Sequence, residues 1–210
     1  MGSATVGVHI HHYLFHPTKL RTLNCTASSA QQDELLRSGK VRPIPAKDAA
    51  QVLRAEGYKL LDVRPAWEWD KARVVGSVHV PLFVEDKGMD PVTLLKKWVH
   101  FGYIGLWTGQ LLTTINDQFL AQVQNAIDDK EAKLLVACGE GLRSRIALKV
   151  LEKGGYKNLA WLAGGFNQSK NSDFPEVEGS GKLQFATIGG VSYLFLQLLL
   201  ILQVLGKDSD

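Results

Sequence analysis

The sequence predicts an α/β domain in which a parallel β-sheet is flanked by helices. Short apolar runs, typical of strands buried on both faces, alternate with segments of helical periodicity. Glycine pairs or a proline close several of these segments, as at Pro81 and Gly164-Gly165. Charged residues are 21% and the AVILMFWYC set is 45% of the 210 residues, enough apolar material for one core with extensions.

The apolar runs predict four strands and the periodic segments predict four helices. We expect the strands at Tyr58–Val63, Ser77–Val80, Lys133–Ala137 and Asn158–Leu162. We expect the helices at Ala46–Glu56, Ala66–Ala72, Phe119–Ile127 and Arg143–Glu152. Strands separated by helices favour a layered domain, whose bounds we place at residues 42–170.

One uncharged stretch, Trp98–Asn116, fits neither pattern. It holds four aromatic residues and three glycines, which makes it too interrupted for a membrane helix. We expect a loop that packs over the sheet or lies at an interface. Contact with a bilayer and the lining of a substrate pocket are two alternatives, because aromatic side chains suit both.

Residues 1–32 contain no Asp or Glu, are rich in Ser and Thr, and hold four of the six histidines. That composition predicts an organelle transit peptide, with plastid favoured over mitochondrion because arginine is scarce. A disordered tail is the alternative. The histidines have no carboxylate or thiol arranged with them, so no metal site is predicted.

The C-terminal part of the chain is apolar. No formal charge lies between Lys182 and Lys207, and leucines would occupy all faces of a helix formed by these residues. Such a stretch predicts a transmembrane helix over residues 183–206, joined to the domain by a flexible linker over 171–182. An apolar helix docked on the domain or on a partner is the alternative.

Charge and cysteine content exclude several functions. A net charge of +3 gives no case for a nucleic-acid partner. Two cysteines, Cys25 and Cys138, cannot form a disulfide framework or a four-cysteine zinc site. Cysteine chemistry must therefore depend on one thiol or on one pair.

The loop that follows the strand KLLVA carries the clearest chemical signal. Cys138 stands at the carboxyl end of a predicted parallel strand, where α/β proteins bind ligands. Gly139 and Gly141 allow the chain to curl, so that backbone N–H groups point inward beside the start of the next helix. Together with Arg143, this cradle would stabilise a thiolate or a persulfide anion. A buried structural cysteine beside a glycine turn is the alternative.

The loop length distinguishes two kinds of cysteine chemistry. Cysteine phosphatases use C-x5-R, which would place arginine at position 144, and that residue is Ser144. The spacing here is C-x4-R, which forms a smaller ring. The smaller ring favours sulfur held on the cysteine over a full phosphate group.

At four places the sequence resembles the single-domain rhodanese family, in its plastid-targeted, membrane-attached plant form. Leu61-Asp62-Val63-Arg64 followed by Glu68-Trp69 is similar to the family's D-V-R-x-x-x-E-aromatic element, and residues 76–81 are similar to its G-A-x-x-x-P segment. Residues 138–144 resemble its active loop, and residues 155–166 resemble its closing L-x-G-G element. Val75 and residues 167–169 depart from the usual family pattern.

The resemblance implies a sulfurtransferase of the thiosulfate or mercaptopyruvate type. Cys138 would be the catalytic residue and would carry sulfur as a persulfide from a small-molecule donor to cyanide or to a thiol or protein acceptor. Substrate binding falls to the loop residues Gly139, Glu140, Gly141, Leu142, Arg143 and Ser144. No metal or organic cofactor is implied. The expected location is a plastid membrane, with the thylakoid favoured.

Two further functions stay open. A membrane-tethered docking domain could use the same fold without turnover, and a redox or persulfide sensor could use Cys138 alone. Glu140 and the aromatic stretch 98–107 motivate the first of these, since an acid inside the loop would repel a dianionic donor. Asp62, Arg64 and Glu68 are interpreted as structural, with Arg64 pairing with Glu68.

Overall fold

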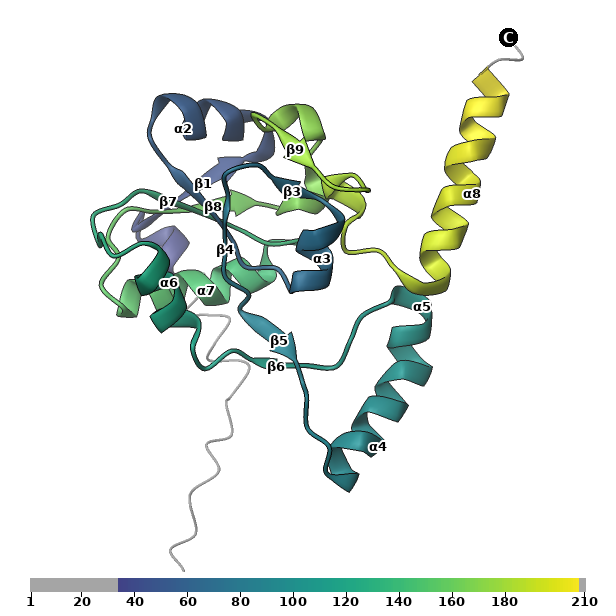
Figure 1. Ribbon diagram of the computed structural model, residues 1–210. Coiled ribbons are helices and arrows are strands. Elements are labelled where there is room, and N and C mark those ends of the chain that lie inside the picture. Colours follow the sequence, from purple (N-terminus) through teal and green to yellow (C-terminus); the bar gives the residue numbers. More distant parts are fainter. Residues whose placement is uncertain (1–33, 208–210) are drawn as a thin grey trace, which may run out of the picture.

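A five-stranded parallel sheet forms the centre of the computed structural model, which describes residues 34–207 (Figure 1). The strand order is β1-β8-β7-β2-β4, and all four pairings are parallel. The strands are β1 (Val41–Pro45), β2 (Lys59–Asp62), β4 (Val78–His79), β7 (Leu134–Ala137) and β8 (Leu159–Ala163). The predicted parallel sheet flanked by helices is therefore confirmed.

Side chains of β7 alternate between two hydrophobic cores, one on each face of the sheet. Leu134 and Val136 pack in the core that contains residues of α6 (Phe119–Ala126) and α7 (Leu142–Lys153). Leu135 and Ala137 pack in the other core, with residues of α2 (Ala49–Ala55). Burial on both faces explains why the strand reads as an unbroken apolar run.

The predicted helices are present with small changes at their ends. The first is divided into a 3-10 turn, η1 (Ala46–Asp48), and α2, while α3 covers Ala66–Lys71. The edge strand β1 was not predicted. Its sequence, VRPIP, carries two prolines, which an edge strand tolerates because only one side pairs with a neighbour.

The prediction of a loop over Trp98–Asn116 is wrong for the first half of that stretch. The chain is helical through α4 (Pro91–His100), the π-helical η2 (Phe101–Gly105) and α5 (Leu106–Thr108). Asp90 caps α4 by accepting from the N–H groups of Val92 and Thr93. The glycines within this helix lower its stability by only about 1 kcal/mol each, which does not prevent it from forming.

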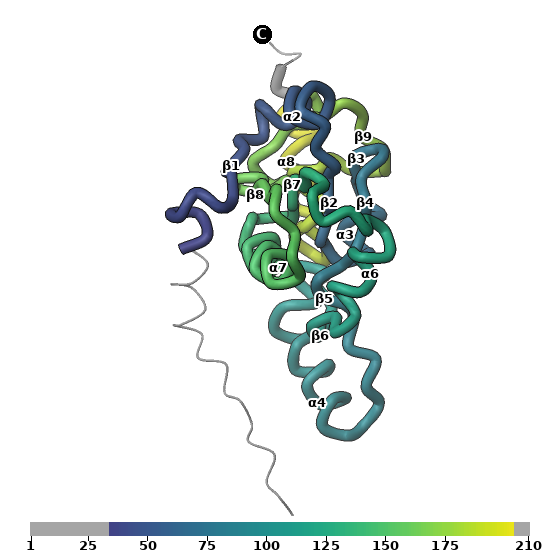
Figure 2. The backbone as a smooth tube through the Cα atoms, turned by 90° about the vertical axis from the view of Figure 1, so that its left-hand side faces the viewer, coloured from purple at the N-terminus to yellow at the C-terminus, as the bar shows by residue number. Residues whose placement is uncertain are grey.

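After this helical segment, a short antiparallel pair of strands brings the chain back to the sheet domain. β6 (Thr113–Ile115) pairs antiparallel with β5 (Phe83–Glu85), so both ends of the 86–112 insertion lie together. Figures 1 and 2 both show α4 projecting away from the sheet.

The segment predicted as a flexible linker, 171–182, is part of the folded domain. It contains the 3-10 turn η4 (Asn171–Asp173) and β9 (Val177–Glu178), and β9 pairs antiparallel with β3 (Arg73–Val74). Phe174 is buried in the core beside Phe166. The folded unit therefore extends past residue 170.

The transmembrane helix predicted over residues 183–206 is not found. Leu183 begins a 3-10 turn, η5 (Leu183–Phe185), and is fully buried in the domain core. The long helix α8 starts only at Gly190 and ends at Lys207. Within residues 34–207, no helix combines the length and the apolar character needed to cross a membrane.

Candidate active site

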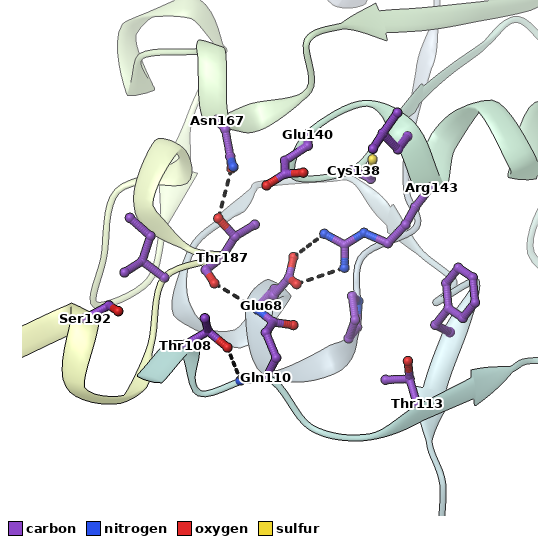
Figure 3. Close-up of a pocket in the computed structure, with 14 residues that line it drawn as sticks. Glu68, Thr108, Gln110, Thr113, Cys138, Glu140, Arg143, Asn167, Thr187 and Ser192 are labelled. Carbon is purple, nitrogen blue, oxygen red and sulfur yellow. Dashed lines mark hydrogen bonds and ion pairs between the residues drawn. The ribbon is translucent and has the colours of Figure 1, made fainter. Parts of the chain in front are cut away.

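A hollow of about 740 Å³ opens at the carboxyl edge of the sheet, with Cys138 in its wall (Figure 3). Loops that follow β2, β7 and β8 meet there, as ligand sites of parallel sheets do. The remaining wall comes from β5, from the chain between α5 and β6, and from the chain that leads into α8 (Gly190–Lys207). The lining residues are Pro65, Glu68, Phe83, Thr108, Gln110, Thr113, Cys138, Glu140, Leu142, Arg143, Asn167, Thr187, Ile188 and Ser192.

The sulfur of Cys138 accepts two backbone hydrogen bonds. The N–H of Gly141 lies 3.1 Å and the N–H of Ser144 lies 3.3 Å from Sγ. The second donor belongs to the first turn of α7, which begins at Leu142, so the positive end of that helix faces the sulfur. Two backbone N–H groups of the curled loop therefore point at the sulfur, which is the arrangement of donors that the sequence predicted.

The side chain of Ser144 completes the surroundings of the sulfur. Its hydroxyl donates to the carbonyl of Gly141 at 2.9 Å and lies 3.5 Å from Sγ, where it accepts from the thiol. The indole N–H of Trp161 donates to the same carbonyl and to the same hydroxyl, each at 3.1 Å. The loop is thereby fixed to strand β8, and Ser144 has a positioning role that its fully buried side chain supports.

The Gly164-Gly165-Phe166 turn holds the other side of the loop. The N–H of Phe166 donates to the carbonyl of Cys138, and the N–H of Asn167 donates to the carbonyl of Gly139. A Cβ on Gly165 would overlap both carbonyl oxygens, and its φ of 65° disfavours other residues. Glycine is needed here because two backbones touch.

Arg143 is bound by Glu68 through two hydrogen bonds. Its NH1 and NH2 atoms donate to the two carboxylate oxygens at 2.8 and 2.7 Å (Figure 3). Burial alone would lower the pKa of Arg143, but the hydrogen bond and charge of Glu68 outweigh it, and the pKa is held above its usual value. The side chain of Glu68 is 1% exposed, so the pair forms a fixed wall of the hollow.

The prediction that Arg64 pairs with Glu68 is wrong. Arg64 binds Asp62 instead, through Nε at 3.0 Å and NH2 at 2.6 Å, and both side chains are fully buried. Asp62 and Arg64 are therefore structural, as predicted, but Glu68 belongs to the site. The spacing from Arg64 to Glu68 suggested a local pair, whereas the true partner of Glu68 is 75 residues away.

Two of the other predicted loop residues lie at the rim of the hollow, and one is buried. Glu140 and Leu142 are exposed and line the hollow, while Gly139 is buried against the C-terminal segment. The carboxylate of Glu140 and that of Glu68 together place two negative charges beside the one positive charge of Arg143 (Figure 3).

The C-terminal segment closes over the active loop, which the sequence did not reveal. The side chain of Thr187 lies so close to Gly139 that a Cβ there would overlap it. Thr187 also hydrogen-bonds Asn167, and its carbonyl accepts from the side chain of Gln110. Lys71 donates to the carbonyl of Ile188, so the side chains of Asn167, Gln110 and Lys71 all hold this segment in place. Thr108, Gln110 and Thr113 of the stretch 98–116 line the hollow, but the four aromatic residues that motivated a pocket wall there are not among the lining residues.

Both histidines of residues 34–207 hydrogen-bond backbone carbonyls. His79 bonds the carbonyl of Arg64 and stacks on Trp69, and His100 bonds the carbonyl of Gln110. In the part of the chain that the structure describes, no group of three or more His, Cys, Asp or Glu residues is placed to hold a metal ion. Residues 1–32, with the predicted transit peptide and Cys25, lie outside the described residues.

Comparison with known proteins identifies the domain. Residues 45–172 match the family described as "Rhodanese-like domain". Rhodanese-like domain-containing protein 10 of Arabidopsis thaliana is 59% identical over 182 residues, which cover 87% of this chain and 85% of that protein. The chloroplastic rhodanese-like domain-containing protein 9 of the same plant is 32% identical, over 76% of this chain and 75% of that protein.

Solved structures include a thiosulfate sulfurtransferase from Pseudomonas aeruginosa, with 16% identity and a TM-score of 0.46. That match covers 73% of this chain and 23% of the other. The match to the family and the identity with its plant members settle the classification: this chain belongs to the rhodanese-like domain family.

Proposed function

We propose that the protein is a sulfurtransferase that carries sulfane sulfur as a persulfide on Cys138. The observation that carries this proposal is the buried sulfur that accepts from the N–H groups of Gly141 and Ser144 at the edge of an open hollow. The same two donors would stabilise a thiolate before the reaction and a persulfide anion after it.

The proposed reaction has two steps and needs no external oxidant. The Cys138 thiolate attacks the sulfane sulfur of the donor, an S–S bond to Sγ forms, and the donor's own bond to that sulfur breaks with its electron pair. The released group is sulfite from thiosulfate, or the enolate of pyruvate, which takes up a proton, from mercaptopyruvate. An acceptor thiolate or cyanide then attacks the outer sulfur, and the Cys138 thiolate leaves.

We propose further that a donor with one negative charge is used in preference to thiosulfate. Arg143 is already neutralised by Glu68, and Glu140 adds a second carboxylate to the wall. A dianion would therefore meet net negative charge, whereas the single carboxylate of mercaptopyruvate is repelled less.

The first experiment measures persulfide formation and turnover in the full chain. Thiocyanate formation from cyanide is followed with mercaptopyruvate and with thiosulfate, and mass spectrometry detects one added sulfur atom on Cys138. Cys138→Ser should abolish both signals, and Cys25→Ser should leave both unchanged. Equal turnover in the Cys138→Ser protein would refute the proposal, and a persulfide without turnover would favour a sensor.

A second experiment tests the donor preference. Glu68→Gln removes the charge while keeping a hydrogen-bond acceptor for Arg143, so the KM for thiosulfate should fall by roughly tenfold. Glu140→Gln should act in the same direction but less, because its side chain is exposed. An unchanged ratio of kcat/KM values for the two donors in both variants would contradict this assignment.

Plastid location is the proposed setting. Relatives named chloroplastic support it, at 39% and 32% identity, as does the acid-free composition of residues 1–32. Residues 1–40 fused to a fluorescent protein should direct it to plastids, and accumulation in mitochondria would favour the alternative.

A further inference from the structure

Two helical segments project from the domain and expose an unusual amount of apolar surface. α4, η2 and α5 form one segment and α8 forms the other; we call the two together the helical arms. Figure 1 shows both arms on the same side of the sheet domain, meeting where α5 touches the start of α8. The junction is close, since a Cβ on Gly190 would overlap the carbonyl of Leu106.

Aromatic and aliphatic side chains on the arms face away from the protein. Trp98 is 75% exposed, Tyr103 is 84% exposed and Trp107 is 52% exposed. On α8 the exposed large side chains are Tyr193, Leu194, Phe195, Leu198, Leu199, Ile201 and Leu202. At about 100° per residue these positions spread over more than half of the helix circumference, which is more than a single groove on a partner protein would cover.

Charge on the arms has one sign. Residues 91–116 and 179–207, which hold the arms and the chain beside them, contain no Asp or Glu and four lysines, Lys96, Lys97, Lys182 and Lys207. Lys96 and Lys182 are exposed, and Lys97 reaches back to the carbonyl of Gly88. Lysines beside exposed tryptophan and tyrosine are the composition that lies at the boundary between lipid headgroups and acyl chains.

A second hollow, of about 680 Å³, lies between the domain and α8 and continues this surface. Its wall includes the apolar side chains of Trp67, Phe185 and Leu200 together with Lys71 and Lys182. None of the described residues that line it is acidic. An apolar cavity with two lysines fits a molecule that has an acyl chain and an anionic headgroup.

We infer that the helical arms dock the protein on a bilayer surface that contains anionic lipids. Apolar side chains around more than half of α8, aromatic residues on the other arm and the absence of acids favour lipid over a second copy or an acidic protein. Thr108, Gln110, Ile188 and Ser192, which flank the α5–α8 junction, also line the Cys138 hollow, so the candidate active site opens beside the docked surface. The inference goes beyond sulfur transfer and does not depend on it.

Vesicle binding by the full chain tests the inference. The protein should float with vesicles of phosphatidylcholine and phosphatidylglycerol, and binding should weaken as salt is added. The double variant Lys96→Glu/Lys182→Glu should bind at least about tenfold more weakly. The matched control is Lys59→Glu/Lys153→Glu, whose exposed lysines lie at the start of β2 and the end of α7, and it should bind as the unaltered chain does.

A spectroscopic measurement identifies the residues in contact with lipid. Brominated acyl chains should quench tryptophan fluorescence, and Trp98→Phe/Trp107→Phe should remove most of that quenching while circular dichroism stays unchanged. Cys138→Ser should bind vesicles normally, which separates this inference from the proposed reaction. No vesicle binding, equal binding by Lys96→Glu/Lys182→Glu, or self-association that occurs in place of binding would overturn the inference.

Discussion

Backbone N–H groups bind the sulfur of Cys138, and the charge of Arg143 lies nearby. Gly141 and Ser144 donate to it, Trp161 fixes their loop, and Gly165 allows the next turn to touch the loop carbonyls. The geometry of the site therefore depends on residues that fix the loop without binding the substrate themselves. Replacing one of these residues should disturb the surroundings of the Cys138 thiol.

Gly165→Ala tests this dependence on shape. The new Cβ would overlap the carbonyl oxygens of Cys138 and Gly139, so we expect a loss of about 3 kcal/mol in unfolding free energy and a loss of persulfide formation. Gly155→Ala is the matched control, because its φ is 91° but nothing lies within 4 Å of its Cβ. Gly155→Ala should lower the unfolding free energy by only about 1 kcal/mol, measured by thermal denaturation. Equal losses in the two variants would contradict the role given to the close contact at Gly165.

Tyr156 should make the stability of the fold decrease at alkaline pH. Burial raises the pKa of Tyr156, and its hydroxyl donates to the carbonyl of Ile127 at 2.5 Å. A raised pKa stabilises the fold below the unfolded-state value of about 10, and that stability is lost as pH rises through the folded value. Melting temperatures should therefore fall more steeply above pH 10 in the unaltered protein than in Tyr156→Phe. Tyr103→Phe, at a position 84% exposed, should leave the slope as it is.

At the scale of elements, one buried ion pair joins three parts of the fold. Arg64 follows β2, binds Asp62 at the end of that strand, donates to the carbonyl of Ala72 after α3, and lies over the ring of Phe166 at 4.3 Å. The position of Glu68, on α3, and of the Phe166 turn both depend on this contact. The pair is thus a support for the active loop, although neither residue reaches the hollow.

Asp62→Asn should show how much this support contributes. Removing the charge leaves Arg64 buried without its partner, which costs about 3–5 kcal/mol in comparable cases. Chemical denaturation followed by circular dichroism measures the change. Glu56→Gln breaks the exposed pair with Arg42 and should barely change stability, so similar losses in both variants would refute a special role for the buried pair.

Local sequence patterns predicted most helices and strands. They failed where contacts with other parts of the chain determine the structure. The run KLLVA predicted β7 because burial on both faces leaves no polar position, and the β1 segment VRPIP was missed because its prolines are acceptable only at an edge. The α4–α5 arm was missed because glycines weaken a helix without forbidding it. The Glu68–Arg143 pair was missed because Arg64, four residues before Glu68, suggested a local partner for that carboxylate.

At the scale of the whole molecule, the chain between 171 and 189 belongs to the domain and α8 does not. Leu183 is fully buried and Ala186 is 1% exposed, whereas Leu194 and Leu198 are more than half exposed. The sequence could predict that this end is apolar, but not where the domain stops. That boundary is set by β9 pairing with β3 and by Leu183 entering the core.

Two truncations locate the boundary. A chain ending at Gly189 should keep a melting temperature close to that of the full chain, because its core is intact. A chain ending at Gly181 loses Leu183 and Ala186 from the core and should lose several kcal/mol, by denaturant unfolding. Equal stability of the two truncated chains would show that η5 does not contribute to the core.

The complete burial of Cys138 determines at which stage of the proposed cycle its sulfur is accessible to other reagents. A sulfur with no exposed surface is shielded from bulky oxidants and alkylating reagents while the protein waits for a donor. In the proposed cycle the transferred atom sits about 2 Å beyond Sγ, and that outer atom alone would emerge into the hollow. Toward bulky reagents, the protein would then be less reactive before it takes sulfur from a donor than while it carries the persulfide.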